Sequence, residues 1–343
     1  AYTAMSILPA GMPSSARNWR EGCAGTGAFR ITSFEPGRSL KLEANPDYWR
    51  PGLPKSAAIE FVFDCSPQEI LAGFRSGKFS MAWDLLPSDV DRLRHEGESG
   101  VRFYEIPILS TDYLALNVHR EPFSDLKLRQ KFFDAIDVDG LVRRYLARLA
   151  VPGHTLIPPG LLDSERAPRR RPAPAARHTG ERIPVKVMFH SVYEAQYGGF
   201  IQELLRSLDE NGFDVDVIDR KGEYRKISGV PDADVTITRW LADYPDADSF
   251  MNSVLHTERG GEGPFCGSPD LDALIEQGRT ESEPSTRQAI YRQIEELIRK
   301  RALILPLFYE QAYCFTRPKV EGLELNFFNP YVPYEYLWIR GSS

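Results

Sequence analysis

The chain has 343 residues, a length that favours two compact units, because a single hydrophobic core rarely serves more than about 250 residues. With 42% hydrophobic and 26% charged residues, it has the composition of a globular protein and not of a disordered or fibrous one. The formal net charge of −6 creates no overall attraction to nucleic acid or anionic lipid, so neither is expected as a partner.

Cysteine spacing and hydropathy exclude further classes. The four cysteines are too far apart for a CxxC zinc or redox site: Cys23, Cys65, Cys266 and Cys314. Two states stay open, buried free thiols or one or two disulfides in an exported protein. No apolar run reaches the roughly eighteen residues of a membrane helix, and residues 1–15 lack the regions of a signal peptide. Since the chain begins without Met, we expect a processed product or a piece of a longer protein.

The first elements are strands followed by a capped helix. Residues 25–49 alternate apolar and polar side chains around the turn EPGR, which predicts a β-hairpin. A buried strand is expected at 58–63. A helix should follow, with Ser66 as N-cap, Pro67 as its first residue and Gly77 as its end.

The next segments repeat this order. Residues 79–86 have the pattern of a strand, and 87–97 that of a helix capped by Ser88 and ended by Gly97. Strands that alternate with helices indicate a mixed α/β unit.

The middle of the chain is helical and then irregular. Residues 124–150 predict a helix with a break between Asp137 and Gly140. The prolines of 151–160 indicate an ordered loop. Residues 163–182 are rich in Arg, Pro and Ala without periodicity, and we expect an exposed, mobile loop there.

A βαβ unit should follow. Residues 185–191 and 213–219 predict strands, with an amphipathic helix over 193–212 between them, so the two strands should be parallel neighbours. Residues 232–240 predict a further strand. Ligands of open α/β sheets collect outside the carboxyl ends of such strands.

The remaining chain predicts two helices and a long strand. The first helix should be capped by Ser268, with Pro269 after it, and the second should cover 282–302. Residues 303–317 form an apolar β segment.

Catalytic and metal-binding signatures are missing. The sequence has no GxSxG, HExxH or GxxxxGK[ST] motif, and its six histidines never stand three or four residues apart. We therefore expect no enzymatic activity, no metal and no cofactor.

One stretch stands out, TRWLADYPDADSF at 238–250, with three carboxylates in six positions. A calcium loop needs ligands at alternate positions and a glycine, which Pro245 and the missing glycine exclude. A catalytic acid would lack an identifiable partner. We expect Asp246 and Asp248 to cap and turn the chain.

Asp243 has a different setting, because Trp240 and Tyr244 flank it in the sequence. Ring surface beside a carboxylate removes part of its water and strengthens its attraction for an ammonium group. This pattern favours a site for a cationic ligand.

Several segments in the same order resemble one protein family. They are GTGAFRITSFEPGRSLKLEANPDYW, AGFRSGKFSMAWDLLPSDV, LALNVHREPFSDLKLRQKFFDAID, WLADYPDADSFMNSVLHT and LDALIEQGRTESEPSTRQAIYRQIEELIRKRALILPLFY. Together these segments resemble the bacterial extracellular solute-binding proteins of family 5, which serve peptide and nickel ABC transporters. The likeness covers about the C-terminal two-thirds of the family's length.

The resemblance implies an α/β, periplasmic-binding-protein-like (type II) fold, with mixed sheets, two lobes and a hinge. Lobe one would comprise 1–117 and 314–343, and would be incomplete; lobe two would be 118–313. The crossing strands would lie near Leu116–His119 and Ala312–Thr316.

The resemblance also assigns the site. In the family's peptide binders, the aspartate of a W-x-A-D-Y pattern pairs with the ligand's α-ammonium, and here that pattern is Trp240, Ala242, Asp243 and Tyr244. Asp243 would be the anchor and Trp240 would line the pocket. Arg239 departs from the small residue usual before the tryptophan. It would either pair with Asp243 and mask it, or recruit a ligand carboxylate or phosphate.

The function implied is non-catalytic binding of a small solute, a peptide above all, in the cleft between the lobes for delivery to an ABC transporter. Such a protein would be a monomer outside the cytoplasm, periplasmic or lipid-anchored, with the transporter permease as its partner. The alternative is a cytoplasmic solute-sensing domain fused to a regulatory or signalling protein. A hydrolase would need a nucleophile and base, and the sequence shows no such pair.

Overall fold

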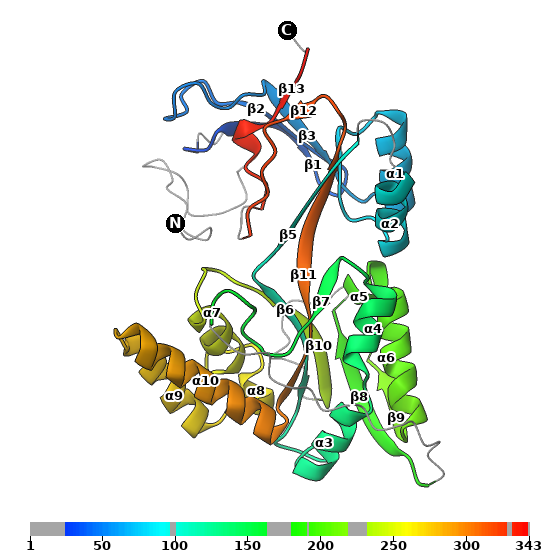
Figure 1. The fold of residues 1–343 in the computed structure, drawn as a ribbon, viewed down its shortest axis with the longest axis vertical. Coiled ribbons are helices and arrows are strands. Elements are labelled where there is room, and N and C mark those ends of the chain that lie inside the picture. The colour runs from blue at the N-terminus through cyan, green and yellow to red at the C-terminus, as the bar shows by residue number, and fades with distance from the viewer. Residues whose placement is uncertain are drawn as a thin grey trace. The chain divides into compact units, whose positions relative to one another are not determined.

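The computed structural model describes residues 25–96, 101–162, 180–190, 192–218, 232–327 and 331–341. The chain divides into two compact units (Figure 1). Unit 1 comprises Ala1–Ile106 and Ala312–Ser343, and unit 2 comprises Pro107–Gln311.

The division differs from the expected one. The chain passes between the units within β5 (Arg102–Pro107) and β11 (Ile304–Thr316). The first boundary lies between Ile106 and Pro107, before the crossing expected near Leu116–His119, and β6 (Ser110–Leu116) pairs with β10 (Val235–Leu241) along its whole length inside unit 2. The second boundary was expected after residue 313 and follows Gln311.

In its described residues, unit 1 contains a three-stranded antiparallel sheet in the order β1-β2-β3, two helices and short strands. Its elements besides β5 and β11 are β1 (Phe29–Glu35), β2 (Ser39–Ala44), β3 (Ala58–Val62), α1 (Pro67–Ser76), β4 (Met81–Ala82), α2 (Pro87–Glu96), β12 (Val320–Glu321), the 3-10 turn Tyr334–Tyr336 and β13 (Trp338–Ile339). The predicted hairpin is confirmed, since Phe29 pairs with Ala44 and Glu35 with Ser39.

The two helices of unit 1 begin in different ways. At α1 the predicted caps are confirmed: the Ser66 side chain accepts from the Glu69 amide, and Gly77 ends the helix at φ 84°. Helix α2 begins at Pro87, so Ser88 lies inside its first turn and the prediction of Ser88 as N-cap is wrong. Gly97 lies outside the described residues.

Unit 2 is built on a mixed sheet in the order β11-β6-β10-β8-β9, with β7 also pairing with β11. Its strands besides those already bounded are β7 (Ala150–Pro152), β8 (Ile183–Phe189) and β9 (Phe213–Val217). Its helices are α3 (Leu126–Asp134), α4 (Val138–Tyr145), α5 (Val192–Ala195), α6 (Gly198–Glu210), α7 (Asp248–Phe250), the π-helical Met251–Leu255, α8 (Gly263–Cys266), α9 (Pro269–Thr280) and α10 (Pro284–Arg301). The strands β8 and β9 are parallel neighbours, as predicted.

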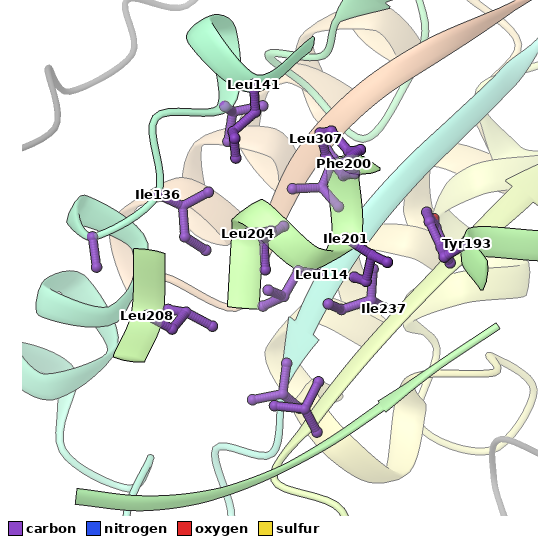
Figure 2. Close-up of a cluster of buried hydrophobic side chains, with 14 of the residues drawn as sticks. Leu114, Ile136, Leu141, Tyr193, Phe200, Ile201, Leu204, Leu208, Ile237 and Leu307 are labelled. Atoms are coloured by element: carbon purple, nitrogen blue, oxygen red, sulfur yellow. The ribbon is translucent and has the colours of Figure 1, made fainter. Parts of the chain in front are cut away.

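Helices cover both faces of this sheet, and β6 is buried on each. Leu114 and Leu116 belong to a core formed with α3, α4 and α6, whereas Tyr113 and Ala115 belong to a second core formed with α9 and α10. Figure 2 shows the first core, in which Leu204 of α6 lies over the strands near Leu114. Each fully buried leucine of this kind stabilises the fold by about 1.5–3 kcal/mol.

Two helix predictions had different outcomes. The predicted break is confirmed, since Asp137 caps α4 by accepting from the Gly140 amide. The single helix expected over 193–212 is instead two, α5 and α6. Helix α6 begins with Gly198 and Gly199. A Cβ at Gly199 would lie 2.9 Å from the Tyr145 ring, so the close contact there requires glycine, a residue that favours helices poorly.

The remaining predictions concern a cap, a loop and the cysteines. Ser268 precedes α9, but its side chain makes no capping hydrogen bond and donates to Asp270 instead. The mobile loop expected over 163–182 lies outside the described residues, apart from 180–182. Free thiols are found at Cys65, Cys266 and Cys314, whereas Cys23 is not described. In the described part of the chain, no helix has the length and hydropathy to span a bilayer.

Candidate functional site

The candidate site begins where β10 ends. Strand pairing continues to its last residues, since Trp240 is opposite Thr111 and Leu241 opposite Ser110. The next residue is still held, because the Ala242 amide donates to the Leu109 carbonyl at 2.8 Å. The turn that follows therefore starts from a fixed strand end.

Buried Ser249 holds the first part of the turn. Its hydroxyl oxygen accepts from the Asp243 amide at 3.0 Å and from Trp240 Nε1 at 3.3 Å. Trp240 packs against the second core of unit 2. The Asp243 side chain is exposed, and among the described residues it has no hydrogen bond or ion pair. The backbone of Asp243 is fixed while its carboxylate stays available.

Asp246 has a structural role. Both its oxygens accept from Arg287, at 2.9 and 2.8 Å, and Oδ1 also accepts from the Asp248 amide at 2.8 Å. Burial favours a higher pKa of Asp246, but the hydrogen bonds from Arg287 and Asp248 outweigh it and hold the pKa below its ordinary value. The prediction that Asp246 turns the chain is confirmed, whereas the N-cap of α7 is Ala247 and not Asp246.

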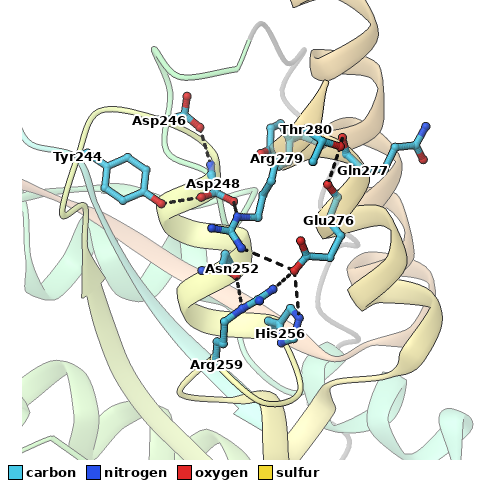
Figure 3. A network of polar contacts seen from close by, with 12 residues as sticks. Tyr244, Asp246, Asp248, Asn252, His256, Arg259, Glu276, Gln277, Arg279 and Thr280 are labelled. Atoms are coloured by element: carbon cyan, nitrogen blue, oxygen red, sulfur yellow. Dashed lines mark hydrogen bonds and ion pairs between the residues drawn. The ribbon is translucent and has the colours of Figure 1, made fainter. Parts of the chain in front are cut away.

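The carboxylate of Asp248 also has partners within the fold. Tyr244 donates its hydroxyl hydrogen to Asp248 Oδ2 at 2.6 Å, and Arg279 Nε lies 3.4 Å from Oδ1. Figure 3 shows that this network continues from Arg279 to Glu276, whose carboxylate also contacts His256. The Tyr244 hydroxyl is thus directed to Asp248.

Arg239 lies on the other face of the sheet, because neighbouring residues of a strand point to opposite faces. Its guanidinium donates to Glu310 Oε1 at 2.7 Å. The pairing with Asp243 is not formed, so the possibility that Arg239 masks Asp243 is wrong. Burial acts to lower the pKa of Arg239, but the neighbouring Glu310 is the strongest opposing influence and the pKa is raised.

The sequence interpretation missed three residues that shape this region: Ser249, Glu310 and Asp112. The sequence carries a signal for Glu310 and Asp112, because each is a lone carboxylate beside apolar strand residues. Asp112 directly precedes YLALNV, and Glu310 lies within LPLFYEQAY. Ser249 had none, because small polar residues are common in turns. No group of three or more His, Cys, Asp or Glu that would hold a metal occurs in the described ranges.

Residues 3–262 match the family model for the middle part of bacterial extracellular solute-binding proteins, family 5. The chain belongs to this family. Among curated relatives, it is 25% identical over 324 residues to "Probable di/tripeptide-binding protein 5" of Pseudomonas aeruginosa, a match that covers 88% of this chain and 59% of the relative. The chain therefore spans about three-fifths of that relative's length.

Solved structures share the type II periplasmic-binding fold. A dipeptide-binding protein of Pseudoalteromonas in complex with Met-Leu aligns with a TM-score of 0.77 at 16% identity, covering 92% of this chain and 64% of that one. NikA of Brucella suis in complex with Fe(III)-EDTA aligns with a TM-score of 0.78 at 21% identity, covering 92% and 68%. Because these neighbours hold different ligands, the fold leaves the ligand to be argued from side chains.

Proposed function

We propose that this member of the solute-binding family binds a peptide through its terminal ammonium group and catalyses no reaction. Asp243 is the anchor for that ammonium, and the Trp240 ring lies beside the bound peptide. Tyr244 orders the turn through Asp248, and Arg239 acts through Glu310 rather than on the ligand.

One observation carries this proposal. Of the three carboxylates in the turn, Asp246 is held by Arg287, and Asp248 by Tyr244 and Arg279. Within the described residues, Asp243 alone of the three has no intramolecular partner, although buried Ser249 fixes its backbone. A positioned but uncommitted carboxylate at the carboxyl end of a strand suits a cationic ligand. The relative named for di- and tripeptide binding supports a short peptide.

The test removes the charge from each side of the pair. Asp243→Asn should weaken binding of a dipeptide, measured by calorimetry, by about one to two orders of magnitude, since a hydrogen bond to a charged group contributes about 1.5–3 kcal/mol. Acetylating the peptide's amino terminus should weaken binding similarly. The two losses should not add, because they remove the same interaction.

A matched control is Asp214→Asn, which makes the same chemical change at an exposed residue of β9. It should leave the affinity unchanged. Additive losses from Asp243→Asn and acetylation would contradict the ammonium role. A protein that binds no peptide but copurifies with another solute, found by native mass spectrometry, would refute the peptide class.

We also propose that the protein works outside the cytoplasm and passes its ligand to an ABC transporter. The family's extracellular solute-binding members support this assignment. Cell fractionation would check it, and a cytoplasmic location would favour a sensing role instead.

A further inference from the structure

A buried polar cluster lies on the sheet face of unit 2 that α5 and α6 cover. Strand pairing assembles it, since Asp112 of β6 is directly opposite Arg239 of β10, and Glu310 comes from β11. Tyr193 of α5 and Tyr197, just before α6, close it with their hydroxyl groups. The cluster contains two carboxylates but one arginine.

The contacts of the Tyr193 hydroxyl indicate that Asp112 is protonated. Its hydroxyl oxygen lies 2.6 Å from Asp112 Oδ1 and 2.9 Å from the Thr238 carbonyl oxygen. A tyrosine has one hydroxyl hydrogen, and a carbonyl oxygen only accepts. Both contacts can be hydrogen bonds at the same time if the Tyr193 hydroxyl donates to the Thr238 carbonyl and accepts a hydrogen bond from a protonated Asp112.

The other oxygen of Asp112 gives the same answer. Asp112 is completely buried, and Oδ2 has no hydrogen-bond partner among the residues that the structure describes. A buried carboxylate with an unsatisfied oxygen is costly, because the charge loses its water without replacement. A neutral carboxyl group carries a much smaller cost.

The hydrogen bond of Arg239 is consistent with a neutral Asp112. Although Asp112 is its direct cross-strand neighbour, the guanidinium donates to Glu310 Oε1 at 2.7 Å. The same oxygen accepts from the Tyr197 hydroxyl at 2.9 Å. Arg239, the one arginine of the cluster, therefore pairs with Glu310, and among the described residues no cation donates a hydrogen bond to Asp112.

The electrostatics agree with this geometry. Burial and then the charge of Glu310 raise the pKa of Asp112 well above its usual range, against Tyr193 and Arg239. His190, the remaining titratable neighbour of Arg239, has a pKa lowered by burial and by Arg239, so it adds no positive charge at neutral pH. Burial also raises the pKa of Tyr193 and of Tyr197, which keeps both hydroxyls protonated.

We propose that folded unit 2 stores a proton on Asp112 at neutral pH, donated to Tyr193, and that this proton lets Arg239 hold Glu310. Loss of the proton creates a second buried carboxylate that competes for Arg239. Glu310 lies next to Gln311, the residue at which β11 leaves unit 2. The protonation state of Asp112 thus determines whether Arg239 stays paired with Glu310, next to the point where β11 leaves unit 2.

Infrared spectroscopy tests the proton directly. Protein whose aspartates carry carbon-13 at the carboxyl group should show, at neutral pH, a protonated-carboxyl band that the isotope shifts. The band should disappear in Asp112→Asn and at alkaline pH. Folded wild-type protein without an isotope-sensitive band would overturn the proposal. The Asp214→Asn variant should retain the band, since Asp214 is exposed.

Two further measurements test the coupling. Glu310→Gln frees Arg239 for Asp112, so the band should vanish at neutral pH; a band that persists would overturn the competition for Arg239. Asp112→Asn mimics the neutral acid and does not titrate. As the pH rises above about 4, the folding equilibrium constant of wild type should therefore fall relative to that of Asp112→Asn by about tenfold per pH unit, until Asp112 ionises in the folded state. Parallel stability curves, or an Asp112→Asn protein that does not fold at neutral pH, would contradict a neutral Asp112.

Discussion

At the scale of single residues, the partner of a carboxylate decides what it does. Asp243 and Asp246 are three positions apart in one turn, yet Asp246 faces Arg287 with both oxygens and Asp243 faces solvent. The charge of Asp246 is used inside the fold, whereas that of Asp243 is available to a ligand. Residue type alone does not separate these roles, because both residues favour turns equally.

A buried acid with little compensation gives the first stability prediction. Glu262 is fully buried, accepts from Thr236 at 2.9 Å, and leaves Oε1 without a partner in the described part of the chain. Burial raises its pKa to about 7, although Thr236 and Tyr113 act to lower it. The folded state thus keeps a proton that the unfolded state loses, so stability falls as pH rises from about 4.5 to about 7.

Glu262→Gln removes that loss. The variant should match wild type near pH 4.5 and be more stable by something on the order of 3 kcal/mol at pH 8, measured by urea unfolding. Glu258→Gln is the matched control, since Glu258 is exposed four positions away. Equal stability of wild type and Glu262→Gln at pH 8 would mean that Glu262 ionises in the fold without cost.

At the scale of elements, local signals predicted what local chemistry determines. The hairpin of β1 and β2 pairs residues at most 15 positions apart, and the cap at Ser66 and the break at Asp137 depend on residues three positions apart. The division of the chain did not follow from such signals, because β6 joins unit 2 through β10 and β11, more than a hundred residues away. Likewise, Ser249 and Glu310 act on the site region through contacts that only the folded chain forms.

The two serines predicted as caps supply a matched pair. Ser66 accepts from the Glu69 amide and Glu69 accepts from the Ser66 amide, whereas Ser88 is exposed inside the first turn of α2. Ser66→Ala should therefore destabilise the protein by about 1 kcal/mol, and Ser88→Ala by less than about 0.5 kcal/mol, in denaturant unfolding. A larger loss from Ser88→Ala would show that the start of α2 depends on that hydroxyl.

At the scale of the whole molecule, the two units bury their sheets to different degrees. In the sheet of unit 1, strand register places one apolar set on a single face: Phe29, Ile31, Phe34, Leu40, Leu42, Ala44, Ile59 and Phe61. None of these side chains is fully buried, and Ile31 and Phe34 are 51% and 46% exposed. Every residue of β6 in unit 2 is buried. Alternation in the sequence predicts such a face, but it does not tell how much of it is covered.

This contrast predicts unequal protection against hydrogen exchange. The strands β2 and β6 are each central in their sheets, with a hydrogen-bonded neighbour on both sides, so a difference between them reports the stability of the surrounding core and not missing hydrogen bonds. Amides of β2 should exchange through local opening at low denaturant, because little apolar burial opposes it, while those of β6 should exchange only on unfolding of unit 2. Mass spectrometry of peptides covering Ser39–Ala44 and Ser110–Leu116 would measure both. Protection of β2 as strong as that of β6 would mean that the apolar face is covered in solution.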